Sequence, residues 1–426
     1  MHVAFFSDQH PASLGGLQVS LGLQRRYLEA LGHMVTVCSP TGRVRSSPQY
    51  SRPTDVVLRA PRWGDHSFQT AGLLADREME VGFSKLPPVD VVHIQADVWG
   101  AWNGYRYAWR HSLPVVHTMH TKIEDTLPAV VKMPKTVARL MFAAQQQYMH
   151  TRVPDMAAYV RAFANAADEL IVPSGHFAEH LRGYGINRPM HVIPTGVDDR
   201  VIGGTVRMEE AGLLEQRERP LLVWPGRISA EKRLLDVLRA LAESGIDADL
   251  DVYGAGPELA RCRALAGRLG IGERVRFHGA VPHDVVMYAI AQADAVVQSS
   301  LGYETQGLTV YEAVSVGTPI VVRDPDIAAD LPAEWVLPVQ DASIAAFAEA
   351  FRELPGLLAP GGRFTQLGAA PTTFRQSALT DRILGVYADA LLAGAGRGTA
   401  ARRSRGMRAA TMARIRKLRG GIANVA

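Results

Sequence analysis

The sequence has few cysteines and no long apolar run. Only Cys38 and Cys262 are cysteines among its 426 residues, and their wide separation gives neither a disulfide framework nor a metal-binding spacing. A reducing, cytoplasmic environment is therefore expected. No apolar run reaches the roughly 18 residues that a membrane-spanning helix requires. The first residues, MHVAFFSDQH, lack a basic region followed by a long apolar stretch, so they are predicted to form a strand rather than a signal peptide.

Acidic residues are absent from the end of the sequence. From Arg397 onward there are nine Lys or Arg residues and no acid, which leaves 37 basic against 42 acidic residues elsewhere. The net charge of +4 therefore comes from residues 396–426, which we call the basic tail. Such a tail could be solvated and disordered, or it could bind an anionic lipid surface, where each base contributes about 1 kcal/mol. Nucleic acid is not expected as a partner, because the tail has no interleaved aromatic residues and the sequence contains no recognised nucleic-acid module.

Short apolar strands alternate with amphipathic helices along the chain, as in parallel sheets built from β-α-β units. In the first half, strands are predicted at HVAFFS, HMVTVC, DVVLRA, VDVVHIQ, PVVHT, DELIVP and HVIP, and helices within 15–32 and 128–166. The pattern restarts with strands at LLVWPG, DLDVYG, VRFHG, DAVVQS and PIVVRD, and helices over 230–243, 257–269, 283–292 and 308–316.

The domain organisation follows from this pattern and from the length. A chain of 426 residues is long enough for two domains, and a polar stretch without apolar periodicity separates its two halves. We predict an α/β fold of two doubly wound Rossmann-like domains that face a central cleft. The N-terminal domain spans 1–198, the linker 199–218 and the C-terminal domain 219–372.

The segment WPGRISAEKRLLDVL follows a predicted strand and begins a helix. Ser229 is expected to be the N-cap, and Arg227 and Lys232 flank the first turn. Free backbone N–H groups and two cations would make this helix start an anion site. A solvated surface pair is the alternative. In VYGAGPE, Gly254 and Gly256 end the next strand, where glycine lets the backbone approach a ligand closely or simply forms a tight turn.

The segment SSLGYETQGLTVYEA carries two carboxylates, Glu304 and Glu312, on either side of a turn that opens a helix. A carboxylate that accepts hydrogen bonds from ribose hydroxyls is typical of nucleotide sites, and Glu312 is suited to that role. Glu304 could accept hydrogen bonds from a sugar, and backbone N–H groups at 306–309 could add donors. By themselves, the two acids could also be ordinary surface residues.

In order and spacing, GRISAEK, GAGPE and ETQGLTVYE resemble the G-R-x4-K, G-x-G-P and E-x7-E motifs of retaining glycosyltransferases with two Rossmann domains, the GT-B fold. The resemblance, which covers all but the basic tail, is to the large family that includes phosphatidylinositol mannosyltransferases and bacterial diacylglycerol glucosyltransferases. It implies that Arg227 and Lys232 hold the donor diphosphate, that Glu304 contacts the transferred sugar, and that Glu312 binds the ribose. A helix over 373–395 is expected to cross back to the N-terminal domain. The implied donor-binding set is Gly16, Arg227, Lys232, Gly254, Gly256, Val281, Gln306, Gly307, Leu308 and Glu312.

The N-terminal half resembles the same family. PASLGGLQVSLG matches its glycine loop and first helix, and PVVHTMHTKIEDTLP matches its His-Thr loop, which implies that His120 contacts the donor sugar. The implied acceptor-binding residues are Gly15, Gln18, Thr121 and Lys122, and the implied catalytic residues are His120, Glu304, Arg227 and Lys232. His117 and His120 are an unconvincing zinc pair without further ligands nearby. No metal and no cofactor is expected beyond the donor, a UDP-hexose or a GDP-hexose. By resemblance, retention would follow from front-face attack in which the leaving phosphate takes the acceptor's proton.

The acceptor is inferred from the basic tail and from residues 128–152. In that segment Lys132, Lys135 and Arg139 alternate with apolar residues, as in a helix that lies on a membrane, although an ordinary helix packed on its own sheet would show a similar pattern. The leading hypothesis is a peripheral enzyme on the inner face of the plasma membrane that glycosylates a diacylglycerol- or phosphatidylinositol-type lipid. The alternatives are a soluble acceptor (a polyol, a small metabolite or a glucan), and a non-catalytic protein that binds sugar nucleotides. A sugar-nucleotide 2-epimerase shares the fold but fits the E-x7-E arrangement poorly.

Overall fold

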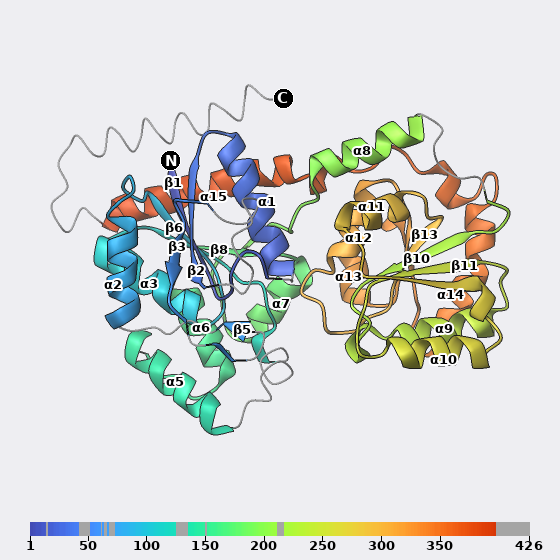
Figure 1. Ribbon diagram of the computed structural model, residues 1–426, viewed down its shortest axis with the longest axis horizontal. Coiled ribbons are helices and arrows are strands. Elements are labelled where there is room, and N and C mark those ends of the chain that lie inside the picture. Colours follow the sequence, from blue (N-terminus) through green and yellow to red (C-terminus); the bar gives the residue numbers. More distant parts are fainter. Residues whose placement is uncertain are drawn as a thin grey trace. The chain divides into compact units, whose positions relative to one another are not determined.

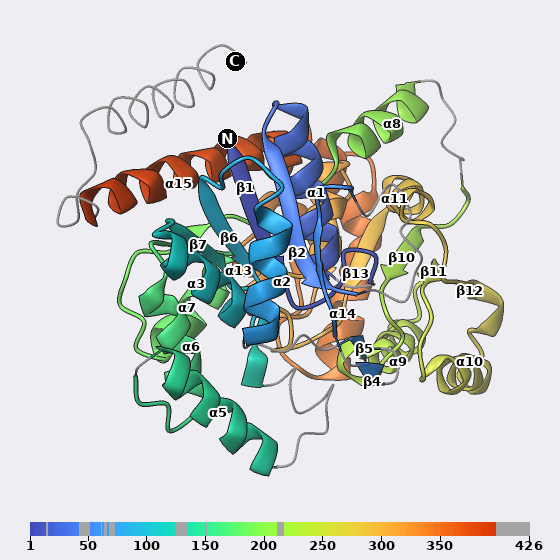
Figure 2. The same ribbon diagram turned by 60° about the vertical axis from the view of Figure 1, so that its left-hand side comes forward.

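The computed structural model describes residues 1–13, 16–41, 52–60, 62–63, 66–67, 73–124, 135–149, 151–210 and 217–397 (Figure 1). It divides into two compact units. Unit 1 is Met1–Thr195 together with the segment that begins at Gln376, and unit 2 is Gly196–Arg375. Each unit has one parallel sheet with helices on both faces (Figures 1 and 2). This confirms the predicted α/β class with two Rossmann-like domains.

The unit 1 sheet has seven strands in the order β3-β2-β1-β6-β7-β8-β9, all parallel. Its central strands are short apolar runs buried on both faces, as parallel strands between two helix layers require. Their bounds are β1 His2–Ser7, β2 Met34–Pro40, β3 Val56–Leu58, β6 Val91–Gln95, β7 Val115–Thr118, β8 Glu169–Val172 and β9 His191–Val192. A separate antiparallel pair joins β4 Arg62–Trp63 to β5 His66–Ser67.

The helices of unit 1 cover its sheet in two groups. Alternate residues of β1 show this, because Val3 and Phe5 pack with helices α1 and α15, whereas Ala4 and Phe6 pack with α2, α3, α6 and α7. The bounds are α1 Gly16–Ala30, α2 Leu73–Phe83, α3 Trp99–His111, α5 Lys135–Met149, α6 Met156–Ala166, α7 Gly175–Gly183 and α15 Gln376–Arg397. Helix α15 contacts α1, β6, β7 and β8, so the C-terminal helix lies on the N-terminal unit, where the sequence placed it.

The unit 2 sheet has six parallel strands in the order β12-β11-β10-β13-β14-β15. They are β10 Leu221–Pro225, β11 Asp249–Tyr253, β12 Val275–Gly279, β13 Ala295–Gln298, β14 Ile320–Val322 and β15 Val336–Pro338. Helices α9 Leu234–Ser244, α10 Leu259–Arg268 and α14 Ile344–Leu358 cover one face. Helices α8 Asp199–Glu210, α11 His283–Ala291, α12 Leu308–Ser315 and α13 Pro325–Ala329 cover the other. The 3-10 turns are η1 Ala230–Lys232, η2 Gly272–Arg274, η3 Ala333–Trp335, η4 Arg363–Gln366 and η5 Thr372–Phe374.

Two expected segments differ in the structure. The predicted linker, 199–218, contains helix α8, which belongs to unit 2 and contacts α11. Ile202 of this helix is buried in the unit 2 core, and this apolar contact packs the otherwise polar helix α8 against unit 2. The helix expected over 128–166 is two helices, α5 and α6, and a new N-cap begins the second: the Asp155 carboxylate accepts from the Ala158 N–H at 2.8 Å.

Helix α5 lies within residues 128–152, the segment for which a membrane-facing helix is predicted. Met141 is buried and Phe142 packs against the unit 1 core, whereas Leu140 is 70% exposed next to the exposed Arg139. Lys132 and Met133 lie outside the described residues. Within the described ranges, no helix has the length and apolar character needed to cross a membrane.

Candidate active site

The order of strands places a topological switch point in each sheet. In unit 2 the chain winds outward from β10 through β11 to β12 on one side, and from β13 through β14 to β15 on the other. Loops that leave the carboxyl ends of β10 and β13 therefore diverge, and in open α/β sheets this is where ligands bind. The loop after β10 carries Arg227 and Lys232, and the loop after β13 carries Glu304. The sequence motifs thus converge on the switch point.

Lys232 and Glu304, which are 72 residues apart in sequence, form an ion pair between these two loops. The ammonium group of Lys232 contacts Oε1 of Glu304, and the hydroxyl of Ser300 donates to the same oxygen at 2.8 Å. Both side chains of the ion pair are mostly buried, with 26% of Lys232 and 16% of Glu304 exposed. Partial burial strengthens the Coulomb attraction between the two charges relative to a solvent-exposed pair. The contacts with Lys232 and Ser300 hold the carboxylate in one orientation.

Arg227 lies beside this pair but is more exposed. Its guanidinium donates to Glu231 at 2.7 Å, and 63% of its side chain is accessible to solvent. The Ser229 hydroxyl donates to the same carboxylate at 2.5 Å. Ser229 has the N-cap position that the sequence suggested, but its hydroxyl donates a hydrogen bond to Glu231 and its side chain makes no cap hydrogen bond. The pKa of Glu231 lies below its usual range. Burial raises this pKa, but hydrogen bonds to the carboxylate, of which the one from Ser229 has the largest effect, together lower it by more.

Gly254 and Gly256 pack the β11 loop directly against the backbone of the Arg227 loop. Ile228 N–H donates to Ala255 O at 2.9 Å, and Glu258 N–H donates to Ile228 O at 3.1 Å. A Cβ at Gly254 would lie 1.8 Å from Gly226 O, and a Cβ at Gly256 would lie 2.1 Å from Ile228 O. These glycines are therefore required by close contact between the two loops, a reason that the sequence pattern did not reveal.

Glu312 lies in the first turns of α12 and is almost fully buried. Its Oε1 contacts Nε2 of His283, the first residue of α11, at 2.6 Å. This hydrogen bond raises the pKa of His283 above its ordinary value against the opposing effect of burial. Gly307, with φ of 76°, caps α12 in a left-handed conformation that favours glycine, and it separates the buried Gln306 from Leu308, the first helical residue. Val281 lies two residues before His283, partly exposed.

In unit 1, strand β7 contains His117 and the loop after it carries His120, and the two histidines have different environments. His117 is fully buried: its Nε2 lies 3.0 Å from Ala96 O, and its Nδ1 lies 3.0 Å from the hydroxyl of Tyr105. Burial lowers the pKa of His117 to about 3 and that of His120 to about 4, so both rings are neutral at physiological pH. His117 is thus part of the hydrogen-bonded core, and His120 is the partly exposed member of the pair.

Two aspartates organise the switch point of unit 1. Asp8, which follows β1, accepts hydrogen bonds from the backbone N–H groups of Asp97, Val98 and Gly100 at 2.7, 3.0 and 2.7 Å, and so holds the start of α3. Asp97, which follows β6, accepts from the hydroxyl of Thr121 and from the backbone of His120. Burial raises the pKa of Asp97 to about 7 in spite of these donors, and the nearby Asp8 adds to the shift.

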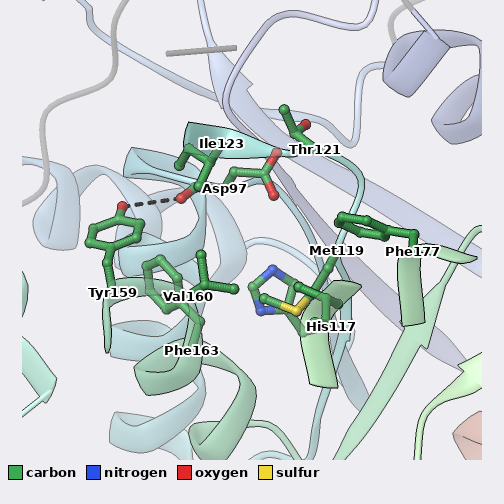
Figure 3. Close-up of a pocket in the computed structure, with 10 residues that line it drawn as sticks. Asp97, His117, Met119, Thr121, Ile123, Tyr159, Val160, Phe163 and Phe177 are labelled. Carbon is green, nitrogen blue, oxygen red and sulfur yellow. Dashed lines mark hydrogen bonds between the residues drawn. The ribbon is translucent and has the colours of Figure 1, made fainter. Parts of the chain in front are cut away.

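A small pocket opens beside Asp97 and the β7 loop (Figure 3). The carboxyl group of Asp97 points toward Thr121, and the ring of His117 lies between Met119 and Phe163 (Figure 3). The hydroxyl of Tyr159 donates to the backbone carbonyl of Asp97 at 3.1 Å, which is the dashed line in the figure. The remaining lining residues are apolar: Ile123, Val160, Phe177 and Leu181. The pocket thus combines apolar side chains with the polar groups of Asp97, His117, Thr121 and Tyr159.

The remaining predicted site residues of unit 1 follow the carboxyl ends of strands β1 and β7. Gly16 begins α1 and is exposed, and Gln18 is buried in its first turn. Lys122 is buried next to Thr121, and Glu124, two residues later, pairs with His180 of α7 at 2.6 Å. Gly15 lies outside the described residues.

Sequence reasoning missed Asp8, Asp97, His283 and Ser300. A signal was present for the first two, because each is an acidic residue within two positions of the end of a buried apolar strand, in FFSD and HIQAD. Nothing in the sequence pairs His283 with Glu312, since the two residues lie on different helices. Among the described residues, no group of three or more His, Cys, Asp or Glu side chains could hold a metal ion.

Comparisons with known families agree with this arrangement. Residues 14–201 match the model of Glycosyltransferase Family 4, and residues 208–355 match that of Glycosyl transferases group 1. The chain is 28% identical over 340 residues to an alpha-monoglucosyldiacylglycerol synthase of Streptococcus pneumoniae, which covers 76% of this chain and 71% of that protein. A protein of the same name from Acholeplasma laidlawii is 25% identical over 343 residues, covering 77% and 81%.

A solved structure shows the same fold. The Anabaena protein HepE, crystallised in complex with UDP, superposes with a TM-score of 0.63 over 91% of this chain and 99% of its own, at 14% identity. At that identity the likeness concerns the fold, and it supports the GT-B architecture. The chain thus belongs to the glycosyltransferases that join a family 4 domain to a group 1 domain.

Proposed function

We propose that the protein is a retaining hexosyltransferase that moves a sugar from a UDP-hexose or GDP-hexose to a membrane lipid of the diacylglycerol or phosphatidylinositol type. The observation that carries the proposal is the ion pair between Lys232 and Glu304 at the switch point of unit 2. It places a cation suited to a diphosphate next to a carboxylate suited to a sugar. HepE was crystallised with UDP in the same fold, which supports a nucleotide-sugar donor.

The reaction breaks the bond between the anomeric carbon and the diphosphate, and negative charge develops on the leaving phosphate. Arg227 and Lys232 would stabilise that charge from fixed positions, so we expect no need for a divalent metal. The acceptor oxygen bonds to the anomeric carbon on the face that the phosphate leaves, and the acceptor's proton goes to a phosphate oxygen. Retention follows because attack and departure occur on one face.

His120 and Glu304 would orient and stabilise the sugar rather than bond to it covalently. A histidine with a pKa of about 4 is neutral at physiological pH, so His120 can exchange a hydrogen bond with a sugar hydroxyl without adding charge. Glu304 is held by Lys232 and Ser300 in one orientation. Its negative charge is then available to the positive charge that develops at the anomeric carbon.

Three observations support a lipid acceptor. Two relatives that cover most of the chain are named for the synthesis of a glucosyldiacylglycerol. Helix α5 exposes Leu140 next to Arg139, as a surface that rests on lipid does. The basic tail would add electrostatic attraction to anionic lipids. We therefore place the enzyme at the cytoplasmic face of the membrane as a peripheral protein.

Nucleotide binding tests the donor site first. Calorimetric titration of the wild type without metal should detect UDP or GDP, and addition of Mg²⁺ should not change the dissociation constant appreciably. Arg227→Ala should weaken binding by about 10–100-fold, because a hydrogen bond to a charged group contributes about 1.5–3 kcal/mol. Arg352→Ala removes another exposed arginine of unit 2 that pairs with a glutamate, and it should bind as the wild type does. Failure of the wild type to bind either nucleotide would reject the proposal.

The acceptor is tested with lipid vesicles. Transfer of labelled glucose or mannose to diacylglycerol or phosphatidylinositol in vesicles that contain phosphatidylglycerol should be detected with the full chain. A variant that ends at residue 396 should bind these vesicles at least about tenfold more weakly at low salt, because several bases leave the surface, and should still turn over a detergent-solubilised lipid. Transfer to a polyol or glucan but to neither lipid would favour the soluble-acceptor alternative.

A further inference from the structure

Strand β13 ends at Gln298, and Ser299 and Ser300 follow it directly; all three polar residues are buried. Because β13 borders the switch point, the two serines begin the loop that carries Glu304, and they contact Lys232 and Glu304. Most buried hydroxyl groups are hydrogen-bonded within the protein, and the partners of each serine show what it holds. The two serines have different partners.

Ser299 holds the backbone of the Lys232 turn. Its hydroxyl donates to the carbonyl oxygen of Lys232 at 2.6 Å and accepts from the indole Nε1 of Trp224 at 2.8 Å. Lys232 is the last residue of η1, and Arg233 after it has a φ of 54°, which is uncommon for a residue other than glycine. The carbonyl group that Ser299 binds therefore lies where the chain changes direction between η1 and α9. A hydroxyl group at this position fixes where the Lys232 side chain starts.

Ser300 holds the side chain of Glu304. Its hydroxyl donates to Oε1 of Glu304 at 2.8 Å and accepts from the amide Nε2 of Gln298 at 2.8 Å. The side-chain oxygen Oε1 of Gln298 in turn accepts from the backbone N–H of Arg323 at 3.2 Å, which ties the group to the end of β14. Glu304 is thus oriented by a chain of hydrogen bonds that starts on the neighbouring strand.

We propose that Ser299 and Ser300 are positioning residues with separate tasks: Ser299 places Lys232 for the diphosphate, and Ser300 places the Glu304 carboxylate for the transferred sugar. The inference rests on the proposed function, since it assigns the two loops to two parts of the donor. It predicts that loss of the Ser299 hydroxyl impairs nucleotide binding and that loss of the Ser300 hydroxyl impairs turnover. A purely structural role would not separate the two effects.

The test measures the dissociation constant of the nucleotide and kcat at saturating donor for Ser299→Ala and Ser300→Ala. Ser299→Ala should weaken binding of UDP or GDP by about three- to tenfold, and Ser300→Ala should leave binding within about twofold while lowering kcat by about tenfold or more. Ser300→Thr keeps the hydroxyl group and should recover most of the lost kcat. Ser315→Ala is the matched control, because Ser315 is a buried serine of the same unit whose hydroxyl has no hydrogen-bond partner among the described residues.

The possible results discriminate between the claims. Equal losses in binding and kcat for both variants, or no loss in either, would overturn the assignment of separate tasks while the wild type still bound nucleotide. A wild type that binds no nucleotide would overturn the proposed function, and this inference with it. Should Ser299→Ala fail to fold because the Trp224 indole loses its acceptor, Ser299→Cys serves for the same measurement. A thiol is close in size to a hydroxyl group but is a much weaker donor and acceptor, so the hydrogen bond to the Lys232 carbonyl weakens and the same direction of change in nucleotide affinity is expected. Nucleotide binding by Ser299→Cys as tight as that of the wild type would then refute the role of Ser299.

Discussion

Glu304→Gln is expected to lower kcat for sugar transfer by about 10²–10³-fold, the loss that follows removal of one preorganised electrostatic contact in an active site. The substitution keeps the size of the side chain and removes its charge. It also leaves the ammonium group of Lys232 without its anionic partner. Because Glu304 is assigned to the sugar and not to the nucleotide, the dissociation constant of UDP or GDP should change by less than about threefold.

Steady-state kinetics at saturating donor and titration of the nucleotide alone measure the two effects separately. Asp249→Asn is a suitable control, since Asp249 has a similar exposure, 22% against 16%, and pairs with Arg276. It begins β11, at the opposite end of the sheet from the loops of the site. If Glu304→Gln kept wild-type kcat, the assignment of this carboxylate to the sugar would be wrong. If it lost nucleotide binding as well, the charge would serve to hold Lys232 in place.

The convergence of Lys232 and Glu304 could be predicted from the sequence, because it depends only on topology. Each residue follows an apolar strand, and the carboxyl ends of parallel strands lie at one edge of a sheet. The motif spacing then gave the two residues their expected roles, and the structure places them in direct contact. The C-terminal helix was also predictable: Leu379, Ile383 and Tyr387 recur every four residues and are buried on the unit 1 sheet.

The hydrogen bonds within the site could not be predicted, because they depend on how loops from different strands meet. Ser229 has the sequence position of an N-cap, yet its hydroxyl donates to Glu231, which is two residues away and pairs with Arg227. The contact between His283 and Glu312 joins two helices that are separated by a strand. The local sequence predicts neither the hydrogen bond from Ser229 to Glu231 nor the one between His283 and Glu312.

The predicted linker was wrong for a related reason. Helix α8 has the sequence DRVIGGTVRMEE, in which Gly203 and Gly204 each cost about 1 kcal/mol of helix propensity. The sequence therefore favours an irregular segment. Burial of Ile202 and Thr205 against unit 2, with contacts to α11, stabilises the helix instead. Tertiary packing of this kind overrides local propensity, and single-sequence patterns do not show it.

Gly256→Ala is expected to lower nucleotide affinity by about 10²-fold and to destabilise the protein by about 2–4 kcal/mol. The added Cβ would lie 2.1 Å from the carbonyl oxygen of Ile228 and 2.6 Å from its carbonyl carbon, so one of the two loops must move. Ile228 is fully buried and adjoins Arg227, and any displacement of its backbone therefore moves the arginine away from the diphosphate.

Gly267→Ala is the control for Gly256→Ala, because it adds the same methyl group to unit 2 at a position away from the contact between the two loops. Gly267 lies in helix α10 of the same unit, and a Cβ there would meet nothing within 4 Å. Alanine should stabilise that helix by up to about 1 kcal/mol and leave nucleotide binding unchanged. Thermal unfolding and titration of both variants check the expectation. If Gly256→Ala unfolded at a lower temperature but bound nucleotide with wild-type affinity below that temperature, contact between the two loops would matter for folding alone, and the position of Arg227 would not depend on it.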